Sequence, residues 1–313
     1  MSASKLFNPN NRKIFLLTSL LVASLALALV SACGRSNDAV SPDGNSSLGG
    51  NLQPDGTVVL VGAGDIGDDG REATAKLLDR IPGTVFTAGD NAYPDGTDED
   101  FVRKYGPTWG RHRGRTKPAP GNHDYNTSGA TGYYKYFGGL AGPSSRGYYS
   151  YDLGSWHIIS LNSNIDMSAG SAQERWLRAD LAASSKECTI AYWHHPRFSA
   201  GKHGSSTQSR DVYQALYEAG AEVVVVGHDH NYQRFAPQTA DGQLDRQRGI
   251  RQFVAGMGGA SSYSFDSPIA NTEAYNTDTY GVLKLTLGPG TYQWEFVPVA
   301  GKTYRDSGSG TCH

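Results

Sequence analysis

The sequence predicts an α/β fold in which mixed β-sheets are flanked by helices. Short runs of β-branched and apolar residues alternate with segments of helical periodicity. Several runs end in a glycine that is followed by a polar or ionisable residue. This layout is typical of sheets that carry a site at the carboxyl ends of their strands. The late apolar runs follow one another closely and look antiparallel, so we expect a mixed sheet system.

The individual elements follow from local composition. Strands are expected, in chain order, at 57–62, 84–88, 222–226, 251–255, 280–287 and 291–297. A helix is expected at 71–81, where apolar residues recur with helical spacing before Pro82-Gly83 ends it. A second helix is expected to begin at Ser171, because Ser171 and Glu174 have the spacing of a capping box.

The segment 121–151 differs from the rest, because it is rich in tyrosine and glycine. We interpret it as a long irregular loop over the site that ends in a strand. Two readings stay open: an ordinary tyrosine-rich surface loop, or a lid over the substrate.

The N-terminus predicts export. Three basic residues precede the uncharged segment 14–30, which has the layout of a secretory signal. The following Val-Ser-Ala-Cys, ending at Cys33, resembles the bacterial lipobox. That resemblance implies a signal peptide at 1–32 and an extracytoplasmic lipoprotein, tethered to the membrane through a lipid on Cys33. An uncleaved anchor or plain secretion are the alternatives, because the segment is about as long as the shortest membrane span.

The rest of the chain is expected to hold a flexible linker at 33–55 and one catalytic domain at 56–313. The linker is rich in Gly, Ser, Asn and Asp and cannot bury a core. In an exported protein Cys188 and Cys312 can form a disulfide, which would pin the end of the chain. A buried thiol with a frayed tail is the alternative.

Charge excludes one class of partner. The formal net charge is −2 and becomes −5 without the three basic residues of the leader. We find no basic stripe, which argues against nucleic acid held by phosphate contacts alone. An anionic substrate must therefore be attracted locally, for example by metal ions. The sequence gives no indication of an oligomeric state.

Residues with metal-binding chemistry occur in five separate segments, most of which follow an apolar strand. In order, they are Asp65, Asp90 with Tyr93, Asn122 with His123, His194, and His228 with His230. Each segment alone is a weak signal, since Gly-Asp pairs and turn-forming residues are common. Their joint occurrence in this order is hard to obtain by chance.

The set resembles the motifs of the calcineurin-like metallophosphoesterases, from Asp65 to His230. Two positions depart from the common pattern of that superfamily. Gly67 stands where a histidine is usual, and Tyr93 stands where an acidic residue is usual. This paired exchange distinguishes the purple acid phosphatases from their relatives, so the chain looks like a purple acid phosphatase. The resemblance implies a metallophosphoesterase fold, a two-sheet sandwich flanked by helices in a single catalytic domain.

The resemblance also implies a dinuclear metal site. It places Asp65, Tyr93 and His230 on a ferric ion, and Asn122, His194 and His228 on a divalent zinc, manganese or iron ion. Asp90 would bridge the two ions. Carboxylate and phenolate oxygens suit trivalent iron, and imidazoles with an amide oxygen suit a divalent neighbour.

The implied activity is hydrolysis of small phosphate monoesters by a hydroxide formed from metal-bound water. His123 is the leading proton donor to the leaving group, with Asp124 expected to orient its ring. His203, nine residues after His194, is a second candidate for contact with the substrate. A phosphodiesterase or nucleotide hydrolase with the same site is the first alternative, and a non-catalytic surface binding protein is the second.

Other polar residues are expected to play no part in the site. The family pattern selects His194 as the ligand, and we expect His195, directly before Pro196, to point elsewhere. Structural or exposed roles are expected for His112, His157 and His313, and local packing for Tyr232 and Arg234.

Overall fold

The computed structural model describes residues 53, 55–67, 70–143, 146–263 and 267–313. The predicted signal peptide (1–32), Cys33 and nearly all of the predicted linker (33–55) lie outside the described residues. Within the described ranges, no helix is both long and apolar enough to cross a membrane.

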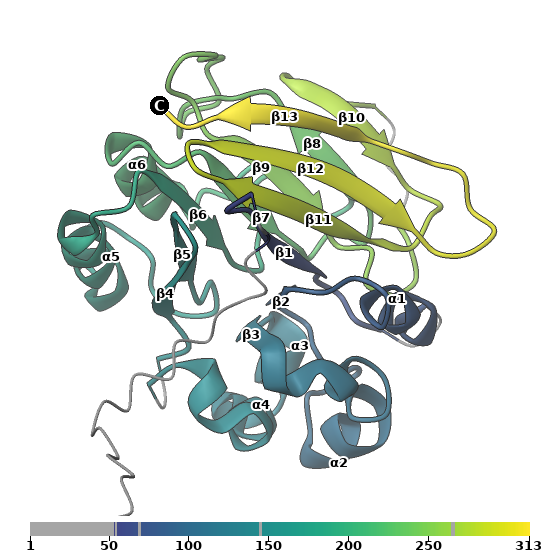
Figure 1. Ribbon diagram of the computed structural model, residues 1–313. Helices are drawn as coiled ribbons and strands as arrows, with labels where there is room; N and C mark the ends of the chain where they lie inside the picture. The colour runs from purple at the N-terminus through teal and green to yellow at the C-terminus, as the bar shows by residue number, and fades with distance from the viewer. Residues whose placement is uncertain (1–52, 54, 68–69, 144–145, 264–266) are drawn as a thin grey trace, which may run out of the picture. The chain divides into compact units, whose positions relative to one another are not determined.

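Two mixed β-sheets form the body of the protein (Figure 1). The six-stranded sheet has the order β13-β12-β11-β1-β2-β3, and the seven-stranded sheet has the order β10-β8-β9-β7-β6-β5-β4. The strands of the first sheet are β1 (Val58–Ala63), β2 (Thr84–Ala88), β3 (Thr116–Ala119), β11 (Gly281–Gly288), β12 (Thr291–Pro298) and β13 (Ser307–Thr311). Those of the second are β4 (Tyr149–Leu153), β5 (Trp156–Ser160), β6 (Cys188–Tyr192), β7 (Val223–Val226), β8 (Tyr232–Phe235), β9 (Arg251–Ala255) and β10 (Thr272–Asn276).

Each sheet contains a parallel group of strands. In the first sheet β1, β2 and β3 run parallel, and in the second β5, β6, β7 and β9 run parallel. The carboxyl ends of the two groups are joined where the Gly64 N–H donates to the Ala255 carbonyl at 2.8 Å. Residues that follow these strands therefore meet at one edge of both sheets.

The expected strands are confirmed, but one was given the wrong neighbours. The antiparallel pairing of β11 with β12 is as expected. In contrast, β9 lies in the other sheet and pairs in parallel with β7. An apolar run indicates burial but carries no information on its partner strand, so proximity in the sequence was misleading here.

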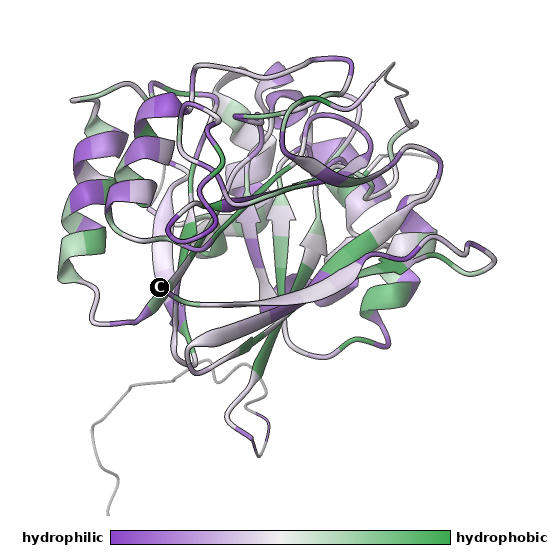
Figure 2. Ribbon diagram, turned by 90° about the horizontal axis from the view of Figure 1, so that it is seen from above, coloured by the Kyte–Doolittle hydropathy of each residue, from purple (hydrophilic) through white to green (hydrophobic). Residues whose placement is uncertain are grey.

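The helices lie beside the two sheets and leave β11, β12 and β13 uncovered on the side seen in Figure 1. They are α1 (Arg71–Leu78), α2 (Asp98–Asp100), α3 (Asn122–Asn126), α4 (Thr131–Phe137), α5 (Ala172–Ala183) and α6 (Arg210–Glu218). Half of the predicted capping box is present: the Ser171 hydroxyl accepts the Glu174 N–H at 3.1 Å, whereas the Glu174 carboxylate accepts the Gly170 N–H. In Figure 2 the helices show both hydrophilic and hydrophobic stretches, as expected of helices with one face on the core.

Two apolar layers hold the elements together. The larger layer contains residues of both sheets, and the rings of Phe86 on β2 and Tyr192 on β6 meet at 5.6 Å. The smaller layer joins the second sheet to α5 and α6 through residues such as Leu177 and Leu216. Most of the β2, β6 and β7 side chains are fully buried, so their carboxyl ends are rigidly placed.

The segment 121–151 is largely helical rather than a long irregular loop. It forms α3, α4 and 3-10 turns before it enters β4. Tyr133 and Phe137 are fully buried and pack with Phe101 and Tyr105 in an aromatic cluster. The tyrosines therefore belong largely to the core. The helices were not predicted from the sequence, because the glycines between the tyrosines interrupt the helical spacing of apolar residues.

A disulfide between Cys188 and Cys312 confirms the expected bridge. It closes a loop with a sequence separation of 124 and ties the end of β13 to the start of β6, in the other sheet. The tail is ordered as well, because β13 pairs along its length with β12.

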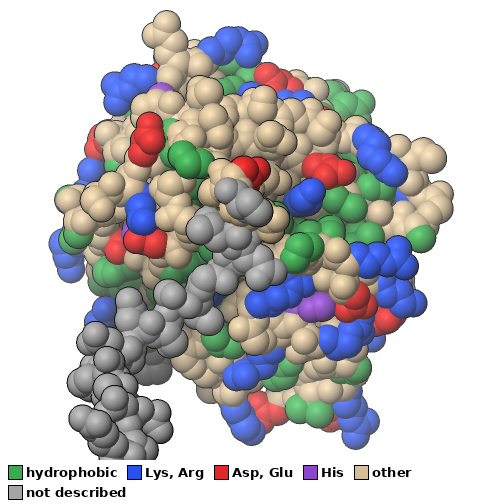
Figure 3. Space-filling model, in the orientation of Figure 1, with side chains coloured by type: hydrophobic (Ala, Val, Ile, Leu, Met, Phe, Trp, Pro, Cys, Tyr) green, Lys and Arg blue, Asp and Glu red, His purple; other side chains and the backbone are tan. Residues whose placement is uncertain are grey.

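On the face shown in Figure 3, Lys and Arg gather in the lower right around a histidine, with a few Asp and Glu side chains beside them.

Candidate metal centre

The predicted ligands all follow strands of the two parallel groups. Asp65 follows β1, Asp90 and Tyr93 follow β2, and Asn122 begins α3 after β3. His194 follows β6, and His228 and His230 follow β7. The structure brings these side chains together into two groups that share Asp90, as the distances below show.

The backbone turns sharply at three of these positions. Asp65, Asp90 and His228 have φ of 59°, 52° and 72°, in the left-handed region. Such conformations cost of order 1–3 kcal/mol each for residues other than glycine, and they cluster at functional sites. Each residue directly follows the glycine that comes after its strand, so the turn holds its side chain at the sheet edge.

The first group surrounds the Tyr93 hydroxyl. Its oxygen lies 3.3 Å from Asp65 Oδ1, 3.1 Å from Asp90 Oδ2 and 3.0 Å from His230 Nε2. Burial, and next the charges of Asp90 and Asp65, raise the pKa of Tyr93 far above its usual value. A phenolate could form here only beside a strong cation.

Gly67 explains why the first group contains a tyrosine and lacks the usual histidine. A Cβ atom at Gly67 would lie 2.6 Å from the Cα of Ala260, so no side chain fits. Tyr93, in the segment that follows β2, supplies a donor instead. The packing of Ala260 against Gly67 in this chain thus agrees with the exchange seen in the sequence.

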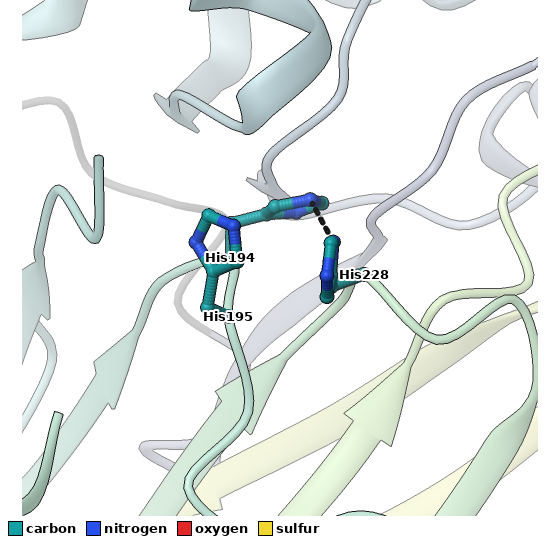
Figure 4. A group of neighbouring side chains, drawn as sticks. All are labelled: His194, His195 and His228. Atoms are coloured by element: carbon teal, nitrogen blue, oxygen red, sulfur yellow. Dashed lines mark hydrogen bonds between the residues drawn. The ribbon is translucent and has the colours of Figure 1, made fainter. Parts of the chain in front are cut away.

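The second group surrounds His194 Nε2. His194 Nδ1 lies 2.8 Å from the Ala88 carbonyl, which only accepts, so Nδ1 carries the proton. In the neutral ring Nε2 then presents a lone pair to Asn122 Oδ1 at 3.0 Å and Asp90 Oδ2 at 3.2 Å. His228 Nδ1 lies 3.2 Å away, as the dashed line in Figure 4 shows. A metal ion at this position would accept the lone pairs of His194 Nε2 and Asn122 Oδ1 together.

The Asp90 carboxylate connects the two groups. Its Oδ2 contacts both Tyr93 and His194, while Oδ1 accepts the His123 N–H at 2.8 Å. Burial opposes ionisation of Asp90, yet the neighbouring His194 keeps the pKa of that carboxyl below its usual range. One oxygen facing two ligand groups is the arrangement of a bridging ligand.

The donor set fits two metal ions. Asp65 and Asp90 are 0% and 1% exposed, and their ion-pair partners are histidine rings. Two buried carboxylates so close together require cations. Ligand atoms of Asp65, Asp90 and His194 lie within 4.8 Å of one another. His230 resembles His194, because its Nδ1 lies 2.7 Å from the Ser261 carbonyl and leaves Nε2 free to ligate.

His123 lies beside the site, but its expected partner is wrong. Its Nδ1 lies 2.6 Å from the Pro94 carbonyl, and its ring packs on Tyr93 at 4.2 Å. Asp124 instead accepts the N–H groups of Gly121 and Asn91 and is fully buried. Burial raises the pKa of Asp124 to about 6. Asp124 faces away from His123 because neighbouring residues of a short helix project in different directions.

His195 also differs from expectation, because its ring turns towards the site. It lies 4.5 Å from the His228 ring and 5.0 Å from the His194 ring, measured between centroids. Figure 4 shows one ring nitrogen facing the other two histidines. The Ser163 hydroxyl oxygen lies 2.8 Å from the other ring nitrogen of His195, Nδ1. Burial, and next the charge of His194, lower the pKa of His195 to about 3.

His203 lies at the same side of the site, exposed to solvent, with its ring 4.3 Å from that of His228. Asp229 positions it, since a buried Asp229 carboxylate accepts the His203 N–H at 2.9 Å and the Ser199 hydroxyl. This role of Asp229 was not predicted from the sequence. The sequence did contain an indication, because Asp229 lies between His228 and His230. A residue between two ligand histidines points away from them and can contact a neighbouring segment.

The remaining polar residues behave as expected. His157 contacts Asp152 and Asp180 at 3.0 and 2.9 Å, far along the strand from the site. Tyr232 and Arg234 both bond to Asp306. His112 contacts Asp79 at 2.9 Å.

The glycines before the ligands permit close approach of the two sheets. A Cβ at Gly227 would lie 2.6 Å from both Asp65 Oδ2 and the Ala88 carbonyl. We expect Gly227→Ala to displace Asp65 and to lower metal affinity about 10- to 100-fold, as for other changes that disturb ligand orientation. Metal content after dialysis, measured by mass spectrometry, checks this.

Gly139→Ala is the matched control, because a Cβ there meets no atom within 4 Å. If Gly227→Ala retains metal as well as the control does, the contact with Asp65 does not shape the site.

The chain matches the family model described as calcineurin-like phosphoesterase over residues 58–232. Curated relatives include purple acid phosphatase 18 of Arabidopsis thaliana, 28% identical over 201 residues, which are 56% of this chain and 44% of the relative. Purple acid phosphatase 21 of the same plant is 34% identical over 96 residues, covering 29% and 22%. A probable inactive purple acid phosphatase 9 is 29% identical over 158 residues, covering 47% and 23%. The chain spans less than half the length of these relatives.

Solved structures share the fold. Purple acid phosphatase PPD1 from yellow lupin seeds superposes with a TM-score of 0.69 at 18% identity, covering 83% of this chain and 54% of the other. GAP50, described as the anchor in the inner membrane complex of Plasmodium, gives 0.64 at 14% identity, covering 82% and 89%. With the matched family model and the strand-end constellation above, these likenesses establish that the chain belongs to the calcineurin-like phosphoesterase family and has purple acid phosphatases among its homologues.

Proposed function

We propose that the protein hydrolyses phosphate monoesters with a dinuclear metal centre. The observation that carries the proposal is Asp90 Oδ2, which faces Tyr93 on one side and His194 on the other. Asp65, Tyr93 and His230 would hold a ferric ion, and Asn122, His194 and His228 a divalent zinc, manganese or iron ion. When bound, the two ions would acidify a water molecule and offset negative charge on the phosphoryl oxygens.

The protein's own groups would position the substrate and move its proton. His123 donates its Nδ1–H to Pro94, so its Nε2 is the atom that can hold and release a proton. We assign it to protonation of the leaving oxygen. His203, held through its backbone by Asp229, is exposed beside His228 and would contact a phosphoryl oxygen.

We place this activity outside the cytoplasm, on a lipoprotein tethered through Cys33. The basic leader, the uncharged segment and the lipobox-like sequence support this placement. The disulfide agrees with it, because oxidising compartments preserve such bonds.

A non-catalytic scaffold is the second candidate function. Two relatives favour it: the phosphatase named as probably inactive, and GAP50, which is described as an anchor. Against it, all seven predicted ligands are present in the sequence, and Asp90 contacts both Tyr93 and His194.

Metal analysis combined with two chromogenic substrates tests the proposal. We expect two metal ions per full-length chain, at least one of them iron, and a broad visible band from tyrosinate bound to iron. We also expect faster turnover of p-nitrophenyl phosphate than of its bis-ester.

Each contrary result has a distinct meaning. Faster turnover of the diester indicates a phosphodiesterase, and no turnover with two metals bound indicates a scaffold. Colourless protein that holds only zinc or manganese contradicts the role of Tyr93.

A further inference from the structure

His195 is a histidine in the site that the ligand set does not use. A ring nitrogen of His195 lies within 4.8 Å of a ring nitrogen of both His194 and His228. Its side chain is half-buried and is therefore partly accessible to solvent. The proximity alone is compatible with an additional metal ligand or with a hydrogen-bond donor. The proton on the ring distinguishes these two roles.

Ser163 determines where that proton lies. The Ser163 hydroxyl accepts the backbone N–H of His195 at 3.0 Å and lies 2.8 Å from His195 Nδ1. Ser163 is 1% exposed, and within the described part of the chain both partners of its hydroxyl belong to His195. The buried hydroxyl hydrogen is satisfied only if it points to Nδ1, which must then accept it. The neutral ring therefore carries its proton on Nε2.

This tautomer is opposite to that of the predicted ligands. His194 and His230 give Nδ1–H to the carbonyls of Ala88 and Ser261 and so offer Nε2 as a lone pair. His195 offers an N–H, which cannot bind a metal ion but can donate to an oxygen anion. Figure 4 shows the nitrogen in question turned towards His194 and His228.

We propose that His195 is a substrate-binding residue that donates its Nε2–H to a phosphoryl oxygen, and that Ser163 is the positioning residue that fixes this tautomer. The inference rests on the proposed function, because it assumes that a phosphoryl group binds beside His194 and His228. His195 and His203 flank the His228 ring, at 4.5 and 4.3 Å. The phosphoryl group would thus be held from two sides.

Two substitutions of similar size separate the donor from the bulk of the ring. Gln at position 195 keeps an N–H near the position of Nε2, whereas Leu fills the space without one. With the metal-loaded full-length chain and inorganic phosphate as the probe, His195→Leu is expected to raise the dissociation constant about 10- to 100-fold, the effect of losing a hydrogen bond to a charged group. His195→Gln is expected to stay within about threefold of the original protein, and both variants should retain two metal ions.

Ser163→Ala tests the positioning role. It is expected to weaken phosphate binding about tenfold in the original protein and to have no further effect in the His195→Leu background. An equal effect in both backgrounds shows that Ser163 acts elsewhere. Thermal denaturation monitors folding, and if the Leu variant does not fold, His195→Asn removes the donor with a shorter polar side chain.

The outcomes are distinguishable. Loss of one metal ion from His195→Leu makes His195 a ligand and overturns the inference. If the original protein hydrolyses monoesters and His195→Leu binds phosphate as tightly as the original protein does, the inference is also overturned. A parent protein that holds two metals but neither hydrolyses monoesters nor binds phosphate overturns the proposed function, and the inference with it.

Discussion

Replacing Asp90 with Asn is expected to lower kcat/KM for phosphate monoesters by about 10³-fold or more. The Asp90 carboxylate presents Oδ2 to Tyr93 at 3.1 Å and to His194 at 3.2 Å, while Oδ1 accepts the His123 N–H. Asn can preserve the contact with His123 through its carbonyl oxygen, but it then places an amide NH₂ between the two ligand groups. An NH₂ group has no lone pair for a metal ion.

The expected loss in kcat/KM follows from the stabilisation of transition-state charge by a bound metal ion, which is worth several kcal/mol. Each tenfold change in rate corresponds to about 1.4 kcal/mol. Metal content should fall below two ions per chain, because the shared oxygen is lost. Steady-state kinetics and elemental analysis of the same preparation measure both effects.

Asp166→Asn is the control for this experiment. Asp166 is exposed and accepts hydrogen bonds from Ser168, away from the site. It undergoes the same change of charge without touching a ligand. An Asp90→Asn protein that keeps both metals and turns over as fast as the control would remove the bridging role.

Replacing His123 with Gln is expected to slow hydrolysis of alkyl phosphates about 10²- to 10⁴-fold, the usual contribution of a general acid. For p-nitrophenyl phosphate we expect a loss of about tenfold or less, because its leaving group needs little protonation. The Nε2 atom of His123 lies 4.0 Å from Asp90 Oδ2, at the edge of the site. Rates for a series of aryl and alkyl esters measure the dependence on leaving-group pKa.

His313→Gln is the matched control, because His313 is exposed at the end of the chain. The slope against leaving-group pKa should steepen in the His123 variant alone. Equal losses for all esters would show that His123 supports the Asp90 loop rather than donating a proton.

The ligand residues could be predicted because their chemistry is local. Each follows a buried strand and a glycine, and the sequence shows where the strands end. Carboxyl ends of parallel strands meet at one edge, so residues such as Asp65 and His228, far apart in the chain, were expected to converge. The distances around Tyr93 and His194 agree with that expectation.

The neighbours of the ligands could not be predicted in the same way. Asp124 was expected to orient His123, yet it serves Asn91 and Gly121. His195 was expected to point away, yet Ser163 holds its ring towards the site. These contacts join segments that are about 30 residues apart in the sequence. No local pattern encodes them, because adjacent side chains take opposite directions that only packing selects.

By itself, the sequence determined the order of the strands that carry the ligands, the types of the ligands and the exchange of a histidine for Tyr93. It did so because strand ends, glycines and ionisable residues are local features. The tertiary structure decided the sheet to which β9 belongs, the helical form of residues 122–137 and the tautomers of His194 and His195. These three features depend on which donors and acceptors of distant segments meet, and the contacts between such segments form only when the chain packs.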